Sequence, residues 1–109
     1  MAAKNRANMV IVISTFSDMG AAKSISTDII QEKLAACASV TQVSSIYMWK
    51  GDVEDTQEFM VLYKTTTESV DHLVQYIKRH HPYETPEILQ IPAESVNDSY
   101  TEWLLDVTR

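Results

Sequence analysis

The sequence predicts a small α/β domain of the α+β kind, in which two long helices cover one face of a four-stranded sheet. Its 109 residues are the usual size of one domain and leave no room for a second core. Runs of β-branched and aromatic residues, typical of strands, alternate with two segments of helical periodicity. Their order is strand, helix, strand, strand, helix, strand, followed by a terminal helix, which is the split βαβ, ferredoxin-like arrangement. Right-handed crossovers place both long helices on the same face of such a sheet.

The first third of the chain predicts a strand and a helix. Residues 1–8 are polar and without periodicity, so a disordered tail is expected to precede a single domain of residues 9–109. Residues 9–16 open with an unbroken, largely β-branched run, which is typical of a strand covered on both faces. Asp18 suits the N-cap position of the following helix. The apolar stripe of this helix repeats every three or four residues and comprises Ala22, Ile25, Ile29, Ile30 and Leu34.

The middle of the chain predicts a β-hairpin. Residues 37–49 are rich in Val, Thr, Ser and aromatic residues, which suit a strand, and the blurred alternation at 40–45 indicates a bulge. Residues 50–52, Lys-Gly-Asp, have the composition of a turn. Residues 59–65 form a second strong strand pattern, so the two strands are expected to pair in antiparallel fashion.

The last third predicts a helix, a short strand and a terminal helix. Residues 65–68, Thr-Thr-Thr-Glu, match a capping box, and Pro82 ends the helix because it disfavours helical geometry at His81. The apolar stripe of this helix comprises Val70, Leu73, Val74 and Ile77. Residues 87–91 form a strand bounded by prolines. Residues 97–106 form a helix that carries Tyr100, Trp103 and Leu104 at helical spacing.

The strand at residues 59–65 is apolar on both faces. Two helices hide only one face of a sheet, and an apolar face left in water marks an interaction surface. A chain this short also buries a modest core, which subunit contacts would supplement. The pattern therefore predicts self-association. The alternative is that the terminal helix folds back over the open face of its own chain. The side chains on the two faces are Met60 and Leu62 against Phe59, Val61 and Tyr63.

Composition and motifs exclude several function classes. Acidic residues outnumber basic ones by 15 to 9, which argues against nucleic acid and anionic membranes as partners. Cys37 has no partner for an internal disulfide, and the apolar run at residues 9–13 is too short for a signal peptide or a membrane span, so a cytoplasmic protein is expected. The chain has two glycines and neither a phosphate-binding loop nor a nucleophile elbow, so no enzyme activity is predicted.

Five sequence blocks together resemble the CutA divalent-cation tolerance family. The resemblance covers residues from about Val10 to Trp103, and the blocks occur in the family's order and spacing. It implies a ferredoxin-like subunit in a compact homotrimer, assembled through the long hairpin and the sheet. It also implies a role in tolerance to divalent metals, copper especially. The blocks are LAAC at 34–37, SIYMWKG at 45–51, EFMVLYKT at 58–65, HPYETPEI at 81–88 and YTEWL at 100–104.

The candidate metal ligands are Cys37, His81 and Glu84, for Cu²⁺ or another divalent metal. A thiolate is a soft ligand suited to copper, imidazole is a common ligand, and a carboxylate supplies oxygen. The alternatives are that Cys37 is a small buried hydrophobic residue and that His81 complements a helix C-terminus. The topology predicts that Cys37 and His81 lie at opposite ends of the sheet, so a site using both would form between subunits.

A cleft is a second candidate site, with Lys64, Glu58, Tyr83 and Trp49 as its ligand-binding residues. Glu58 and Lys64 share one strand face but lie six residues, about 20 Å, apart, too far to pair directly. Trp49 and Tyr47 could stack on a flat ligand, although packing is the commoner role. The leading prediction is a cytosolic, non-enzymatic homotrimer that binds a divalent metal. The alternatives are a signalling or small-molecule-binding trimer that resembles the PII regulators, and a structural trimer that docks partner proteins.

Overall fold

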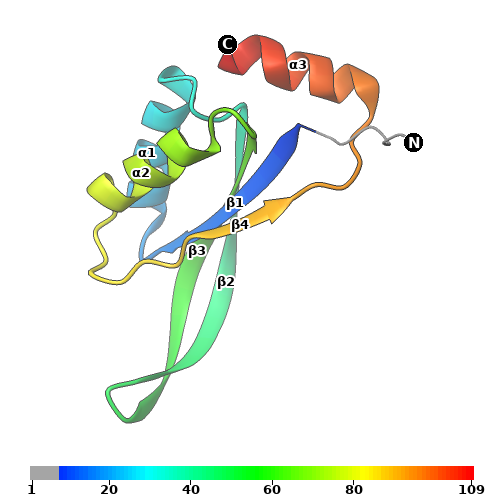
Figure 1. Ribbon diagram of the computed structural model, residues 1–109. Helices are drawn as coiled ribbons and strands as arrows, with labels where there is room; N and C mark the ends of the chain where they lie inside the picture. Colours follow the sequence, from blue (N-terminus) through cyan, green and yellow to red (C-terminus); the bar gives the residue numbers. More distant parts are fainter. Residues whose placement is uncertain (1–7) are drawn as a thin grey trace.

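Four antiparallel strands form one sheet in the order β2-β3-β1-β4, in a computed structural model that describes residues 8–109. The predicted order of elements is confirmed (Figure 1). The expected tail, residues 1–8, lies outside the described residues except for Asn8. The elements are β1 Met9–Phe16, α1 Met19–Gln31, β2 Cys37–Trp49, β3 Asp52–Thr66, α2 Val70–His80, β4 Leu89–Pro92 and α3 Asp98–Thr108.

The core lies between the sheet and the pair of helices α1 and α2. Strand residues at alternating positions supply one side of it, as the period of two requires. The apolar stripes of the two helices supply the other side, and the side chains at its centre are fully buried. The most buried large members are Phe16, Tyr63, Ile29, Leu73 and Ile77. Tyr63 places its hydroxyl 2.9 Å from Ser26 Oγ, which satisfies both polar groups inside this core.

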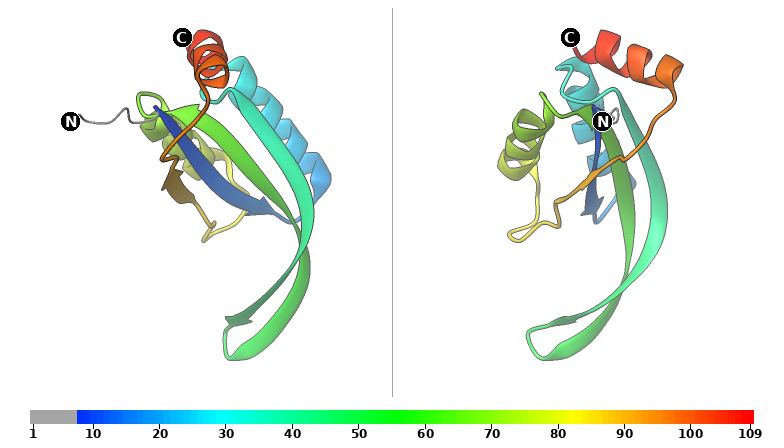
Figure 2. Two further views of the ribbon diagram at one scale, coloured as in Figure 1. Left: turned by 90° about the vertical axis from the view of Figure 1, so that its right-hand side faces the viewer. Right: turned by 45° about the vertical axis from the view of Figure 1, so that its right-hand side comes forward.

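The hairpin of β2 and β3 is longer and more regular than the sequence pattern predicts. Pairing runs without interruption from Cys37 opposite Lys64 to Trp49 opposite Asp52, so the predicted bulge is wrong. The turn is the two residues Lys50-Gly51, with φ of 51° and 87°, as a type I′ turn requires. β3 begins at Asp52 rather than at residue 59, because the pairing with β2 continues through residues 52–58 up to the turn. These residues are mostly polar and lack the apolar alternation that would have predicted a strand. The hairpin projects beyond the other strands, and its tip curves to lie below the loop that follows α2 (Figure 2).

Two predicted element boundaries differ in detail. The capping box at residues 65–68 is absent; instead Thr66 Oγ1 accepts the Ser69 N–H at 3.1 Å, and α2 begins at Val70. The last strand runs from Leu89 to Pro92, so it begins two residues later and ends one residue later than the predicted 87–91. The other helix start is confirmed, because Asp18 Oδ1 accepts the Ala21 N–H at 2.8 Å.

The terminal helix covers only one end of the open sheet face. Leu104 of α3 is fully buried against Met9 and Ala36 in a small second cluster. Further along the open face, Leu89 and Ile91 are 48% and 45% exposed. Most of this apolar face is therefore uncovered within one subunit, which is a feature of surfaces that bind another protein. Within residues 8–109, the helices are all too short or too polar to cross a bilayer.

Candidate functional site

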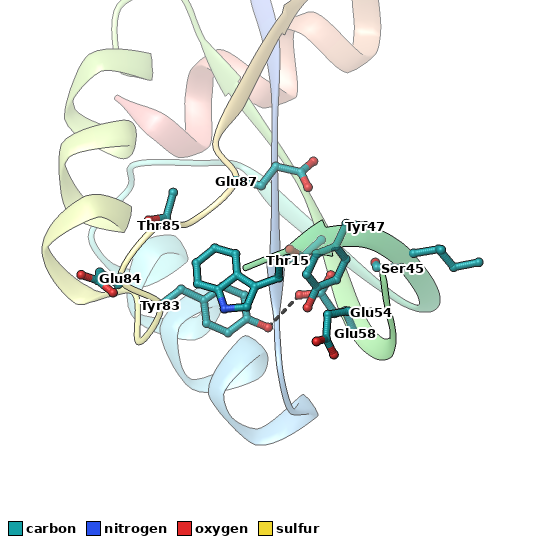
Figure 3. Close-up of a pocket in the computed structure, with 11 residues that line it drawn as sticks. Thr15, Ser45, Tyr47, Glu54, Glu58, Tyr83, Glu84, Thr85 and Glu87 are labelled. Carbon is teal, nitrogen blue, oxygen red and sulfur yellow. Dashed lines mark hydrogen bonds between the residues drawn. The ribbon is translucent and has the colours of Figure 1, made fainter. Parts of the chain in front are cut away.

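A pocket of about 730 Å³ lies on the open sheet face, between the curved hairpin and the loop that follows α2. Figure 3 shows its side chains, which come from β1, from both hairpin strands and from residues 83–87. Tyr47 and Glu54 are paired across the hairpin and therefore share this face. Thr15 and Glu58 are on the same face of the sheet, further from the turn.

One short hydrogen bond joins the two walls of the pocket. The Tyr83 hydroxyl donates to Glu58 Oε2 at 2.7 Å, a distance typical of an O–H bond to a carboxylate (Figure 3). Glu58 as a whole residue is 9% exposed. Burial first, and then the adjacent Glu58 carboxylate, raise the pKa of Tyr83 well above its usual range. Tyr83 is therefore a neutral donor at physiological pH, and it ties the loop to β3.

His81 anchors the loop to β1. Its Nδ1 accepts the Tyr83 N–H at 3.0 Å, so Nδ1 carries no proton. Nε2 therefore carries the proton and donates to the Thr15 carbonyl oxygen at 2.8 Å. The ring also stacks on Phe16, with centroids 4.4 Å apart and planes inclined by 13°. Within one subunit the imidazole has no lone pair left for a metal ion.

Burial controls the protonation of this anchor. Desolvation lowers the pKa of His81, and the Thr15 carbonyl and the Glu58 carboxylate oppose the shift without reversing it. The neutral ring is the form that Tyr83 requires, because a protonated Nδ1 could not accept its N–H. Within one subunit, the histidine that the sequence nominates as a metal ligand therefore holds the loop after α2 to β1, beside the pocket rather than in its lining.

Cys37 lies at the other end of the sheet, beside Lys64. The Lys64 ammonium donates to Ser39 Oγ at 2.7 Å and lies 3.7 Å from Cys37 Sγ. Lys64 pairs with Ile11 on β1, four residues from the Thr15 that holds His81, which is about 13 Å along the strand. The predicted separation of Cys37 from the His81 loop is present in the structure.

The predicted metal ligands do not meet in one subunit. Among residues 8–109, no three side chains of His, Cys, Asp or Glu are grouped so that they could hold a metal ion. A site that uses Cys37, His81 and Glu84 therefore stays a prediction for the contact between subunits.

The structure brings together three of the four predicted cleft residues. Glu58, Tyr83 and Trp49 line the pocket, whereas Lys64 lies apart from it beside Cys37. Sequence reasoning missed Glu54, because residues 52–58 carry no strand pattern. The two-residue turn was the available signal, since it places position 54 opposite Tyr47.

Comparison with known proteins places the chain among described relatives. The profile of one family, described as CutA1 divalent ion tolerance protein, matches residues 10–107. A protein of Yersinia pestis named divalent-cation tolerance protein CutA is 37% identical over 98 residues, which are 89% of this chain and 82% of that protein.

Solved structures agree with this match. CutA of Synechococcus elongatus superposes with a TM-score of 0.92 at 30% identity, covering 94% of this chain and 92% of that one. A protein of Archaeoglobus fulgidus named periplasmic divalent cation tolerance protein CutA has a TM-score of 0.89 at 27% identity, covering 93% of this chain and 99% of that one.

Proposed function

Because this chain belongs to the CutA1 family of divalent ion tolerance proteins, we propose that it works as a homotrimer that binds divalent metal, copper in particular, between its subunits. The observation that carries the proposal is the uncovered apolar sheet face. Leu89 and Ile91 lie on it, and Met60 and Leu62 of the central strand β3 are only partly buried. A second and third copy would remove this surface from water and would bring opposite ends of neighbouring sheets together.

The proposed metal ligands come from two subunits. The Cys37 thiolate of one copy would meet Glu84 of its neighbour, which is an exposed carboxylate at the mouth of the pocket. His81 would join them only if its Nδ1 released the Tyr83 N–H. A thiolate with one or two harder ligands suits copper better than Ca²⁺ or Mg²⁺, which select oxygen ligands alone.

Calorimetric titration with Cu²⁺, combined with mass measurement by light scattering, tests this proposal. We expect a trimer that takes up a whole number of ions, and loss of that uptake in Cys37→Ser and in Glu84→Gln. Glu102→Gln, which changes an exposed carboxylate on α3, is the matched control and should bind as the parent does. A monomer, or weak uptake without stoichiometry in a trimer, would refute direct metal binding between subunits.

The pocket supports a second candidate function, a small-molecule-binding trimer of the signalling type. A volume of about 730 Å³ is in the range of small-ligand sites. Binding without turnover is proposed in either case, because the residues that line the pocket include neither a nucleophile-base pair nor a phosphate loop. A third candidate, docking of a partner protein, is favoured by the exposed apolar side chains near the hairpin tip, Ile46, Met48 and Val53.

We propose the cytoplasm as the place of action, since the single cysteine suits a reducing compartment. The Archaeoglobus fulgidus neighbour is named as periplasmic, so fractionation of the native cells is the appropriate test. Recovery of the protein with periplasmic markers would overturn this part of the proposal.

A further inference from the structure

We propose that Lys64 of one copy forms an ion pair with Glu58 of the next copy, and that three such pairs fix the register of the trimer. The proposal rests on the homotrimer proposed above and deepens it by naming a polar contact between its subunits. It does not depend on metal binding. Its basis is the position of two opposite charges on the uncovered apolar face of the sheet.

Lys64 is an isolated cation on this sheet. Among the described residues of the four strands it is the only Lys or Arg. Its side chain lies on the same face as Met60 and Leu62, because side chains alternate along a strand. Within the subunit the ammonium donates to Ser39 Oγ at 2.7 Å and lies 3.7 Å from Cys37 Sγ. Neither neighbour is a carboxylate, so the charge of Lys64 is not paired with an acidic residue of its own chain.

Glu58 is the complementary charge, further towards the hairpin turn on the same face. It is the most buried Asp or Glu among residues 8–109. The Tyr83 hydroxyl is a neutral donor to its Oε2, and within the described part of the chain Glu58 takes part in no ion pair. Glu54 shares the face but is less buried and closer to the turn, so water solvates it more easily. Of the two carboxylates, Glu58 gains more from a cation.

The two charges do not meet within one subunit. They are six residues apart on β3, about 20 Å along the strand. Lys64 is opposite Cys37 at the start of β2, whereas Glu58 is opposite Val43 near the middle of that strand. Any ion pair between these two positions therefore joins two copies of the chain.

Covering the apolar face gives this pair its importance. A copy packed on Met60 and Leu62 excludes water from the ends of the face as well, and a buried charge without a partner is strongly destabilising. Pairing Lys64 of one copy with Glu58 of the next satisfies both charges at once. Because the charges lie at opposite ends of the face, each contact is head-to-tail, and head-to-tail contacts generate a closed ring when the rotation closes.

A double-variant cycle on dissociation of the trimer tests the pairing. The parent, Lys64→Met, Glu58→Gln and the double variant are diluted at one urea concentration that makes dissociation of the parent measurable, and light scattering records the mass. Each single variant should raise the concentration of half-dissociation by about 30-fold. This follows because an about tenfold loss at each of three contacts multiplies to about 1000, and that concentration varies as the square root of the dissociation constant.

The double variant shows whether the two positions touch. Its shift should again be about 30-fold, because the first substitution already breaks the pair, whereas independent positions would give about 900-fold, the product of the two. Positions about 20 Å apart in one chain act independently, so coupling reports a contact between copies. Asp71→Asn is the matched control, since Asp71 is exposed on α2, on the other side of the sheet. Its effect should multiply with that of Lys64→Met.

Charge reversal gives a second test, without urea. Lys64→Glu should lower the mass to that of a monomer, because two carboxylates would face each other, and Glu58→Lys added to the same chain should restore the trimer. Circular dichroism accompanies each measurement to record the fold.

Two results would overturn the inference: a double variant whose shift is the product of the single shifts, or a Lys64→Glu trimer as stable as the parent. Both leave the homotrimer itself standing. A monomeric parent, in contrast, would refute the proposed assembly and this contact with it.

Discussion

The hydrogen bond between Tyr83 and Glu58 should contribute measurably to stability, and Tyr83→Phe removes it with little change in shape. The bond is 2.7 Å long, and its acceptor belongs to Glu58, a residue that is 9% exposed. Hydrogen bonds to charged groups contribute about 1.5–3 kcal/mol. Because the pocket is open, water can replace part of the lost donor, so we expect a loss of about 1–2 kcal/mol in the free energy of unfolding.

Thermal denaturation measures this loss, at one fixed protein concentration because the stability of an oligomer depends on concentration. A loss of that size lowers Tm by about 4–8 °C for each kcal/mol in a domain of this length. Glu58→Gln and the double variant complete a cycle, in which we expect a coupling energy of about 1 kcal/mol. Tyr47→Phe is the matched control, because the Tyr47 hydroxyl only accepts a weak bond from Thr56 at 3.4 Å.

Two outcomes would contradict this reasoning. Equal effects of Tyr83→Phe and Tyr47→Phe would show that the loss of any hydroxyl in the pocket has the same consequence. Additive effects of Tyr83→Phe and Glu58→Gln would show that the two side chains do not interact in solution.

Four further predictions concern the core, the loop that His81 anchors and one helix end. Burial raises the pKa of Tyr63 to about 12, so its stabilising contribution is complete below pH about 10 and is lost as the pH rises through 12. Urea unfolding from pH 9 to 12 should show this loss, and the loss should be smaller in Tyr63→Phe, in which Tyr83 still titrates with a raised pKa. Burial lowers the pKa of His81, so its contribution to stability is present above pH about 6.5 and is lost as the pH falls below that value. The resulting dependence of the free energy of unfolding on pH should vanish in His81→Gln. Leu73→Ala in the core should cost about 2–5 kcal/mol by denaturant titration, whereas Gln75→Ala on the exposed side of α2 should stay within about 0.5 kcal/mol. Lys33 follows the end of α1 with a φ of 62°, a conformation that glycine adopts without strain. Lys33→Gly should therefore raise the midpoint of urea unfolding by an amount equivalent to about 1 kcal/mol. A lower midpoint would contradict the expected relief of backbone strain.

The fold was largely predictable because its signals are local. Asp18 precedes a helical stripe and caps it as expected. Phe59, Val61 and Tyr63 alternate with Met60 and Leu62, and the two sets lie on opposite faces of β3 as the period of two requires. Such patterns depend on residues within about one turn or one strand of each other, so the sequence records them directly.

The polar half of the hairpin was not predictable from its own residues. Residues 52–58 are mostly polar, with no alternation that indicates a buried face. They are a strand because the two-residue turn at Lys50-Gly51 extends the pairing with β2. The information that makes them a strand therefore lies in the partner strand, and for that reason Glu54 was not predicted to line the pocket.

By itself, the sequence determined the order and faces of the elements, the apolar sheet face and the resemblance to a tolerance family. Only the tertiary structure decided that Tyr83 reaches Glu58 across 25 positions of the chain, and that His81 uses both ring nitrogens on Thr15 and Tyr83. It also placed Lys64 with Cys37 rather than in the pocket. The physical reason is that a site depends on strand register and loop closure, which join residues whose separation in sequence carries no periodic signal.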